Sequence, residues 1–388
     1  MNQGKCENFK YMSICFVAGL VLILLLCVFF GDKKFSETEN RVLTQLPKFD
    51  AESILDGDYT KNFEKYAADT IVFRDFWVKF KNTADFVSNK KDNGYAYFGK
   101  KDDLFLIETT NEELLKKNIA AVQGLAKNTD LKVTALIAPT ANLVLKENLP
   151  KDAESFQNYK QTDIFARLSE ELGDTFVDVR KSLEKHSGEY IYYKTDHHWT
   201  SLGAYYAYVE LAKHLGFEPI TQDRFQKRVL STEFRGSIEA KIPTFFSPKD
   251  EIWAYENAEM LAADAKFEDG KQAKIFDESF LAKRDKYSYF LGGNHPLIKL
   301  ERKIDEREKI GETKSVLLIK DSYANCLAPL LLEHYQKVYL VDLRYYRQSI
   351  KTLITDIQYS DNVRLSDIVV LYNAPQFSTD VNAALMAR

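Results

Sequence analysis

Cysteine is scarce in this 388-residue chain, and its distribution excludes a disulfide framework. Only four cysteines occur, and three of them, Cys6, Cys15 and Cys27, lie in or beside one apolar N-terminal segment. Cys326 is therefore alone in the rest of the sequence. A disulfide needs two thiols, and cysteine-based zinc sites need several. The part of the chain after the apolar segment must be stabilised by its core alone.

The chain also lacks a strong charge of either sign and any long basic run. Lys and Arg total 53 and Asp and Glu total 57, which leaves a formal net charge of -4. Nucleic-acid-binding domains usually carry a basic patch or stripe, so we expect no nucleic-acid partner. The hydrophobic fraction is 45%, a normal value for a globular core.

One long apolar run stands at the N-terminus. From Met12 to Phe30 the chain reads MSICFVAGLVLILLLCVFF, nineteen residues without a charge. As a helix this run would span roughly 28 Å, close to the hydrocarbon thickness of a bilayer. A cleaved signal peptide usually has a shorter apolar stretch and a small-residue cleavage site. Neither is present, and Leu26 is unfavourable before a lipoprotein cysteine at Cys27, so we predict an uncleaved signal anchor.

Lysines flank the apolar run on both sides, so they hardly indicate its orientation. They are Lys5, Lys10, Lys33 and Lys34. The excess of positive charge that marks a cytoplasmic flank is therefore missing. Because a short N-terminal tail before a large domain usually stays inside, we expect residues 35–388 on the extracellular side of the cell membrane, held by a single span.

The predicted organisation has four parts. They are a cytoplasmic tail (1–11), a transmembrane anchor (12–30), a polar juxtamembrane stem (31–57) and a large globular domain (58–388). Within the globular domain, residues 217–310 are charged and irregular, with strand-like segments around Ile252 and Tyr287. We interpret this stretch as an insertion.

Short apolar runs in the large domain predict buried strands. They lie at 132–139, 175–179, 315–320, 337–342 and 367–373. Continuous apolar runs of this length are typical of parallel strands that are covered on both faces.

Segments with helical spacing separate these runs. Helices are predicted over 58–90, after a capping box of Thr110 and Glu113, and over 164–172, 201–215, 324–335 and 348–357. The helix over 201–215 has clear limits, because Thr200 or Ser201 can cap its start and Gly216 ends it. Alternating strands and helices with short connections indicate an α/β fold, a parallel sheet with helices on its faces.

Polar residues follow three of the predicted strands. They are Asp321-Ser322, Asp342 with Arg344, and Asn373. Parallel sheets place ligands beyond the carboxyl ends of their strands. Ser322 lies between a buried strand and a predicted helix, so its hydroxyl would stand beside free backbone N–H groups that can stabilise an oxyanion. The alternative is that Ser322 is simply a helix N-cap, a common role of serine.

Two of the six histidines stand side by side in YYKTDHHWTSLGAYYAY, residues 192–208. A metal site needs converging ligands, whereas neighbouring residues in an extended chain point to opposite sides, so His197 and His198 do not chelate together easily. Asp196 and His198 lie two residues apart, a spacing that lets a carboxylate orient an imidazole toward a hydroxyl. A third interpretation is structural, with Asp196 and Thr200 as turn and cap residues. These alternatives stay open on spacing alone.

The same segment carries a resemblance to a known family. The string Thr195-Asp196-His197-His198-Trp199-Thr200, followed by Gly203-Ala204, closely resembles the signature of the DHHW protein family. That family is related to the SGNH-type alginate O-acetyltransferases, whose motif keeps the Asp, the second His and the Trp. Further shared marks are Phe35-Ser36-Glu37 with Asn40-Arg41, the segment Asp69 to Arg74-Asp75, Leu291-Gly292-Gly293-Asn294, and Lys320-Asp321-Ser322-Tyr323.

The resemblance implies an SGNH-hydrolase-like catalytic domain at 58–388. It would be circularly permuted, because the Asp–His pair precedes the serine in the chain. Carried over by motif, Ser322 is the nucleophile, His198 its base and Asp196 the residue that orients the base. His197 and Trp199 would be structural. The usual Gly-Asp-Ser block reads Lys320-Asp321-Ser322 here, so its glycine is missing.

The resemblance leaves the oxyanion and substrate-binding groups open. The amide of Ser322, Gly293 and Asn294 are candidates, Asn373 is less favoured, and Arg344 is a further polar residue at a strand end. For Gly293 the alternative is a turn that requires positive φ. No metal and no other cofactor is implied.

The activity implied is transfer of an acetyl group to a cell-envelope or exported polysaccharide through an acyl-serine. The acyl group would come from a polytopic membrane-bound O-acyltransferase as partner protein. Apart from the resemblance, the insertion at 217–310 lies between the base and the nucleophile, a position from which it could shape the acceptor groove. A carbohydrate esterase would use the same triad, and a non-catalytic glycan-binding or assembly protein would keep only the fold. The sequence does not separate these three.

Overall fold

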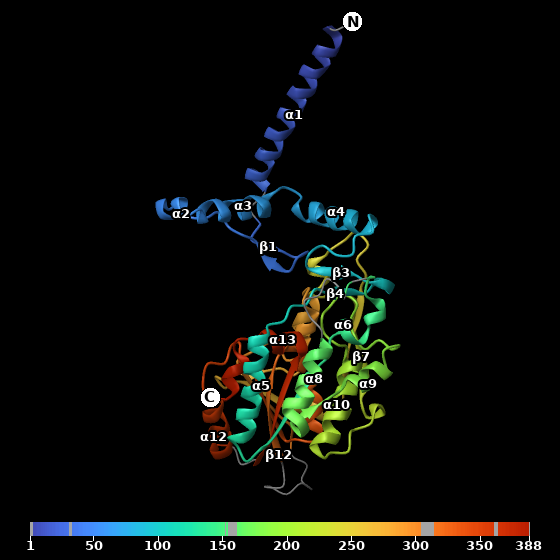
Figure 1. Ribbon diagram of the computed structural model, residues 1–388, viewed down its shortest axis with the longest axis vertical. Coiled ribbons are helices and arrows are strands. Elements are labelled where there is room, and N and C mark those ends of the chain that lie inside the picture. The colour runs from blue at the N-terminus through green and yellow to red at the C-terminus, as the bar shows by residue number, and fades with distance from the viewer. Residues whose placement is uncertain are drawn as a thin grey trace. The chain divides into compact units, whose positions relative to one another are not determined.

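The computed structural model describes residues 3–30, 33–151, 153, 161–303, 314–360 and 364–387. The chain divides into two compact units (Figure 1). Unit 1 comprises Met1–Asn89 and Ala240–Ser247, and unit 2 comprises Lys90–Glu239 and Pro248–Arg388. Residues 58–89, which the sequence assigned to the large domain, therefore group with the N-terminal segment.

Unit 2 is built on an eight-stranded sheet with the order β10-β9-β11-β13-β12-β14-β5-β6. The strands are β5 (Lys132–Ala138), β6 (Phe176–Val177), β9 (Asp264–Phe267), β10 (Gln272–Ala273), β11 (Leu297–Glu301), β12 (Lys314–Lys320), β13 (Lys337–Val341) and β14 (Arg364–Asn373). The five strands from β13 to β6 pair in parallel, and β11, β9 and β10 extend the sheet in antiparallel fashion. All five predicted strands are confirmed, as is a mixed α/β fold with a mostly parallel central sheet.

Alternate residues of the central strand β12 enter two different cores. Val316 and Leu318 belong to one apolar cluster, and Leu317 and Ile319 belong to the other. Helices cover both faces: α9 (Arg180–Lys185) and α10 (Ser201–Leu215) lie on the first, and α5 (Glu112–Lys127), α8 (Gln161–Leu172), α12 (Ile350–Ser360) and α13 (Ala374–Thr379) on the second (Figure 1). Burial on both faces explains why the strands read as continuous apolar runs.

Helix α10 begins and ends where the sequence predicted. The Thr200 hydroxyl accepts a hydrogen bond from the amide of Gly203, and Gly216 ends the helix with φ +86°. The start of α5 differs from the prediction: the side chain of Asn111, rather than Thr110, accepts from the Leu114 amide at 3.0 Å. Asparagine caps a helix at least as well as threonine, so the cap moved by one residue.

The helix predicted over 324–335 is wrong. This stretch forms two short 3₁₀ helices, η8 (Ser322–Asn325) and η9 (Ala328–Glu333). Pro329 lies at the start of η9. Proline has no N–H, and its ring clashes with the carbonyl four residues earlier, so a continuous α-helix cannot run through this position.

Only part of the predicted insertion at 217–310 stands apart from the sheet. β7 (Gln226–Phe234) pairs with β8 (Asp250–Glu256), which confirms the strand around Ile252. β9, β10 and β11 instead extend the central sheet, and residues 240–247 belong to unit 1. The strand predicted around Tyr287 is wrong, because Asp285 caps a 3₁₀ helix, η7 (Lys286–Tyr289), by accepting from the Ser288 amide.

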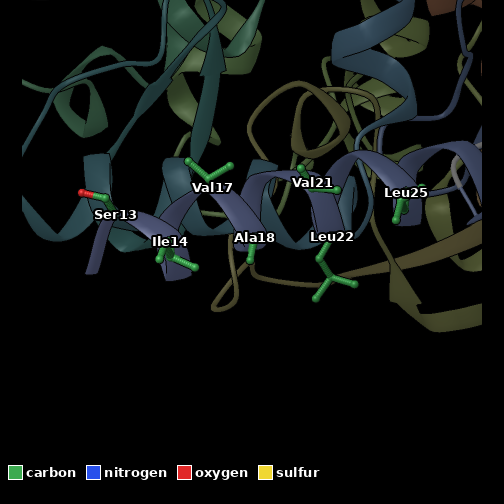
Figure 2. A pocket seen from close by; sticks show the side chains of 7 residues that line it. All are labelled: Ser13, Ile14, Val17, Ala18, Val21, Leu22 and Leu25. Atoms are coloured by element: carbon green, nitrogen blue, oxygen red, sulfur yellow. The ribbon is translucent and has the colours of Figure 1, made fainter. Parts of the chain in front are cut away.

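Unit 1 contains one long apolar helix and a group of short elements. They are α1 (Gln3–Phe30), β1 (Phe35–Ser36) paired with β2 (Arg41–Val42), α2 (Ala51–Leu55), α3 (Asp58–Thr70) and α4 (Arg74–Val87). The helical prediction for 58–90 is confirmed as two helices, separated at Phe73, which has φ +57°. Within α1, Lys10–Cys27 is long and apolar enough to cross a membrane, with a mean hydropathy of 2.3. Figure 2 shows side chains spaced by three or four residues along one face of this helix.

Candidate active site

The turn that carries Ser322 is fastened to the neighbouring strand by Asp321. One carboxylate oxygen of Asp321 accepts from the Tyr323 amide at 2.8 Å. The other accepts from the backbone amide of Asn373 at 2.8 Å and from its side-chain amide at 2.6 Å. Asp321 is buried, and burial raises the pKa of its carboxyl group. Asp321 thereby joins the carboxyl ends of β12 and β14 next to the serine.

The Asp-His-His-Trp segment is held against the same turn. Trp199 is fully buried, and its indole N–H donates to the Tyr323 carbonyl at 2.9 Å. In return, the Tyr323 hydroxyl donates to the His197 carbonyl. These two hydrogen bonds run in opposite directions between the segments, so each segment orients the other.

Asp196, His198 and Ser322, the three residues assigned to a triad from the sequence, lie together in one hydrogen-bonded chain. His198 Nε2 lies 2.8 Å from Ser322 Oγ, and His198 Nδ1 lies 2.5 Å from Asp196 Oδ1. Asp196 also accepts from the amides of His198, at 3.0 Å, and Ser237, at 2.7 Å. The base and the serine are 124 residues apart in the chain, so the fold brings them together.

The charge state of Asp196 determines the imidazole tautomer. Burial alone would raise the pKa of Asp196, but the neighbouring His198 and His197 rings and the Ser237 amide hold it well below its usual range. An ionised carboxylate only accepts hydrogen bonds, so His198 Nδ1 must carry the proton. In the neutral ring Nε2 then presents its lone pair to the Ser322 hydroxyl.

His197 does not point away from the site, contrary to the prediction. Its ring lies against that of His198, with 3.8 Å between centroids, and its Nδ1 lies 2.6 Å from Ser237 Oγ. The backbone bends at residues 194–198 instead of running extended, so neighbouring side chains converge. Burial of the ring and the adjacent His198 lower the pKa of His197 to about 4, although 34% of the side chain remains exposed.

Asp196, His197 and His198 also have the composition of a metal site. Their ligand atoms all lie within 4.8 Å of one another. Both nitrogens of His198 are engaged, however, one with Asp196 and one with Ser322. A metal ion bound by His198 would displace one of these bonds, so the arrangement favours acid–base chemistry.

Gly236 lets its own stretch of backbone pass close to Asp196, a role that the sequence did not predict. A Cβ at Gly236 would lie 2.2 Å from the Cβ of Asp196. The Gly236 amide donates to the Thr195 hydroxyl at 2.9 Å, and the next amide, from Ser237, donates to the Asp196 carboxylate. Any larger residue at position 236 would displace the carboxylate that orients the base.

Tyr287 contacts both the base and the serine, and the sequence carried no signal for this role. Its ring stacks on the His198 imidazole with 3.8 Å between centroids and 11° between planes. Its hydroxyl lies 3.1 Å from the Ser322 carbonyl, to which it donates, and 3.4 Å from Cys326 Sγ. Burial raises the pKa of Tyr287 well above its ordinary value, so the phenol keeps its proton.

Lys320, which replaces the glycine of the usual block, is a buried cation at the end of β12, two residues before the serine. Its ammonium donates to Asn294 Oδ1 at 3.0 Å and to Asn325 Oδ1 at 2.7 Å, and lies 4.0 Å from Asp342. Burial lowers the pKa of Lys320 to about 8, although Asp342 opposes the shift. Arg344 holds the same Asp342 through two side-chain hydrogen bonds of 2.8 and 2.5 Å.

The predicted oxyanion donors differ in which of their N–H groups already donate hydrogen bonds within the protein. The Gly293 amide donates to the Phe290 carbonyl in a tight turn with φ +96°, so this glycine serves the turn. Asn373 gives both its backbone amide and a side-chain N–H to Asp321. The carbonyl of the Asn294 side chain accepts from Lys320 and from Asn325, so its NH₂ group is the part left for a ligand.

A small cavity adjoins the acidic side of the site. Its volume is about 40 Å³, and Asp196, His197, Tyr323 and Asn373 are among the lining residues. Glu108 also lines it and is buried, accepting from the Thr140 hydroxyl at 2.5 Å and from the Gln161 amide at 2.8 Å. Burial raises the pKa of Glu108 to about 7.

Comparisons with known proteins agree with this fold. A family model described as DHHW protein matches residues 110–341. A DHHW family protein from Eubacterium siraeum shares the fold with a TM-score of 0.59 and 19% identity, over 75% of this chain and 97% of its own. PatB1 from Bacillus cereus gives 0.58 and 17%, over 74% and 96%. No match was found among curated proteins.

The matched residues contain the Asp-His-His-Trp segment, the serine turn and most of the sheet. They make up more than half of the chain. The chain therefore belongs to the DHHW protein family. The solved relatives are distant in sequence, so their likeness establishes the fold and leaves activity to be argued from the site.

Proposed function

We propose that this protein is a membrane-anchored O-acetyltransferase that modifies hydroxyl groups of a cell-envelope or exported polysaccharide. The observation that carries the proposal is the chain of hydrogen bonds from Asp196 through His198 to Ser322. A serine hydroxyl that is hydrogen-bonded to an imidazole oriented by a carboxylate is the arrangement of nucleophilic acyl transfer. The resemblance of the motif to SGNH-type alginate O-acetyltransferases suggests the acetyl group and the sugar acceptor.

In the first half-reaction, His198 Nε2 takes the Ser322 proton while Ser322 Oγ attacks the carbonyl carbon of the acyl donor. A tetrahedral intermediate forms, and its collapse breaks the bond to the donor's leaving group. That group departs with the proton returned by His198. Asp196 stays ionised throughout and stabilises the imidazolium.

In the second half-reaction, a sugar hydroxyl takes the place of the leaving group. His198 removes its proton, the oxygen attacks the acyl-serine, and collapse transfers the acetyl group to the sugar. The proton returns to Ser322 Oγ, which restores the starting state. Water can attack the same intermediate, so the protein transfers only if the sugar excludes water from the site.

The oxyanion of both intermediates needs donors that are fixed in advance. The Ser322 amide, at the start of η8, and the NH₂ group of Asn294 are the proposed donors. The buried Lys320 supports this assignment, because its bond to Asn294 Oδ1 dictates which end of that side chain is free. Arg344 is proposed to bind substrate at the same strand edge, and His197 and Trp199 to hold the segment in place.

The remaining proposals concern location and partners. Helix α1 is proposed as a single transmembrane span, with the residues after it on the extracellular side. The acyl group is proposed to come from a polytopic membrane-bound O-acyltransferase. Neither metal nor cofactor takes part in the steps above.

The test uses the full-length chain in detergent with a serine-directed fluorophosphonate probe. Labelling should be lost in Ser322→Ala and in His198→Ala, and kept in Ser88→Ala, a surface control at the end of α4. Labelling that survives Ser322→Ala would refute the site assignment. A sulfonyl fluoride is a suitable second probe, since PatB1 has been solved with a sulfonyl adduct.

A second step separates the three candidate activities. The protein is given an activated acetyl ester with and without envelope glycan, and both free acetate and acetylated glycan are measured. Glycan-dependent transfer supports the proposal. Acetate release that glycan does not divert indicates an esterase, and a protein that neither labels nor turns over is a glycan-binding or assembly protein.

A further inference from the structure

Large apolar side chains are unusually exposed in unit 1. Apart from those on α1, they include Phe49, Leu55, Phe63, Phe73, Phe76, Trp77, Phe80, Phe245 and Phe246. The exposed fraction reaches 90% for Leu55, 78% for Phe49 and 73% for Phe246. Among the described residues of unit 2, which is several times larger, only six large apolar side chains are exposed. An exposed patch of this kind marks a surface that is covered by something else.

Aromatic rings, some exposed and some half-buried, form rows along α3 and α4. On α3, Phe63 lies between Tyr59 and Tyr66, with ring centroids 6.2 and 6.1 Å away. These residues are spaced by three and four, so they share one helical face. The hydroxyls of the tyrosines give this face a partly polar edge.

The cluster on α4 joins the helix to the second segment of unit 1. Phe76 contacts Trp77 and Phe80, with centroids 5.3 and 6.1 Å apart, and reaches Phe245 at 5.5 Å. All four rings are about half exposed, from 47% for Phe245 to 53% for Phe80. They pack on one another while half of each ring stays uncovered.

These helices adjoin the end of the apolar helix α1. The Val72 amide, between α3 and α4, donates to Cys27 Sγ at 3.3 Å, and Cys27 is the last residue of the candidate span (Figure 1). The β1–β2 hairpin braces the junction, because Arg41 and Arg74 both pair with the buried Asp69. If α1 crosses a bilayer, the α3–α4 junction is thus fixed at the depth where the hydrocarbon ends.

We propose that α3, α4 and the loop at 240–247 lie in the lipid–water interface, with their aromatic rows inserted among the lipid headgroups. This inference rests on the span proposed for α1. Tryptophan, tyrosine and amphipathic helices concentrate at this depth because they are apolar on one side and polar on the other.

A bilayer fits this surface better than a protein partner. The face is continuous with the end of the span, so lipid meets it without any further association. Exposed charges of both signs lie on the same helices, such as Asp58 at 63%, Lys61 at 70% and Lys81 at 64%. They suit a hydrated headgroup layer, and their mixed signs predict no requirement for anionic lipid.

The distribution of tryptophan makes the test direct. The chain has three, and only Trp77 is exposed, at 50%, whereas Trp199 and Trp253 are 0% and 4% exposed. The full-length protein is reconstituted into phosphatidylcholine vesicles with bromine on the acyl chains, either close to the headgroup or near the bilayer centre. Bromine quenches indole only at short range, so buried tryptophans contribute little.

We expect quenching by the shallow bromine position that exceeds quenching by the deep one, and loss of this component in Trp77→Phe. Aqueous iodide should have little effect on Trp77. Strong quenching by iodide with none by shallow bromine would overturn the proposal. So would bromine quenching that disappears as the protein-to-lipid ratio rises, because a second copy would then be covering the face.

Whether α1 spans the membrane is measured separately. Carbonate extraction and flotation report whether the chain is inserted at all, and fluorophosphonate labelling of Ser322 reports the active site. A chain that floats, resists carbonate and labels, yet shows no shallow quenching, refutes only the interfacial placement. A chain that does not float refutes the span and the placement together, and leaves the proposed chemistry standing.

Discussion

Replacing Asp196 by asparagine tests the proposed chemistry with the least change in shape. The Asp196 side chain is 5% exposed and accepts from the His198 ring, the His198 amide and the Ser237 amide. Asparagine keeps one acceptor oxygen for the amides but brings an NH₂ group. If that group faces His198, it forces Nδ1 to accept, so the proton moves to Nε2.

A proton on Nε2 leaves the base unable to take the Ser322 proton. It also removes the carboxylate that stabilises the imidazolium. Losing the correct tautomer in a triad of this kind costs about a thousand- to ten-thousand-fold in rate. At about 1.36 kcal/mol per tenfold, this corresponds to roughly 4 to 5.5 kcal/mol of transition-state stabilisation.

The assay is the rate of fluorophosphonate labelling together with acetate release from an activated ester. Both should fall together, because both need the activated serine. Thermal unfolding of the variant checks that the fold is intact. An intact variant that loses less than about tenfold would refute the assignment of Asp196 as the orienting residue. A suitable control is Asp178→Asn, since Asp178 pairs with Arg180 in a surface ion pair.

Three further predictions concern residues around the triad. Tyr287→Leu removes the ring stacked on His198 and should lower the labelling rate by about ten- to a hundredfold, whereas Tyr287→Phe, which keeps the stack, should lose less than about tenfold. Lys320→Met should lower kcat with little change in KM, because Asn294 loses the bond that orients it, and an unchanged kcat would contradict this. Glu108 should make the free energy of unfolding depend on pH. Its raised pKa means that the folded state favours the protonated form, so the contribution of Glu108 to stability is complete below about pH 4.5 and is lost as the pH rises to about 7. Over that window the free energy of unfolding of the wild type should fall by up to about 3 kcal/mol relative to that of Glu108→Gln, since His197 and the other titrating groups are common to both proteins, as measured by urea unfolding at several pH values.

Much of the fold could be predicted because buried parallel strands leave a strong local signal. The runs that became β12 and β14 are apolar at nearly every position, since both faces of each strand are covered. The motif around Asp196 and His198 was equally local, because the acid and the base lie two residues apart in the chain. Such patterns need no knowledge of the rest of the chain.

The contacts that complete the site are long-range, and local patterns cannot reveal them. Tyr287 comes from a 3₁₀ helix that its own sequence does not distinguish from a strand. Gly236 is required by the close packing of the Asp196 side chain, forty residues away. In the sequence, Lys320 is only a departure from the usual Gly-Asp-Ser block. The fold buries its ammonium beside Asn294 and Asp342, and these contacts explain why a lysine is accommodated there. The orientation of His197 was predicted wrongly because residues 194–198 form a bend rather than an extended segment.

The two hydrogen bonds that join Tyr323 to Trp199 and to His197 have a consequence for how the sequence can change in evolution. They tie the segment of the base directly to the turn of the serine, across the 124 residues that separate His198 from Ser322. The connecting stretch is therefore constrained where it returns to the site, at Gly236 and Ser237 behind Asp196, at Tyr287 on the His198 ring and at Asn294 beside Lys320, and its length and sequence can vary between those points. Surface residues between those points can diversify while the reaction centre stays unaltered.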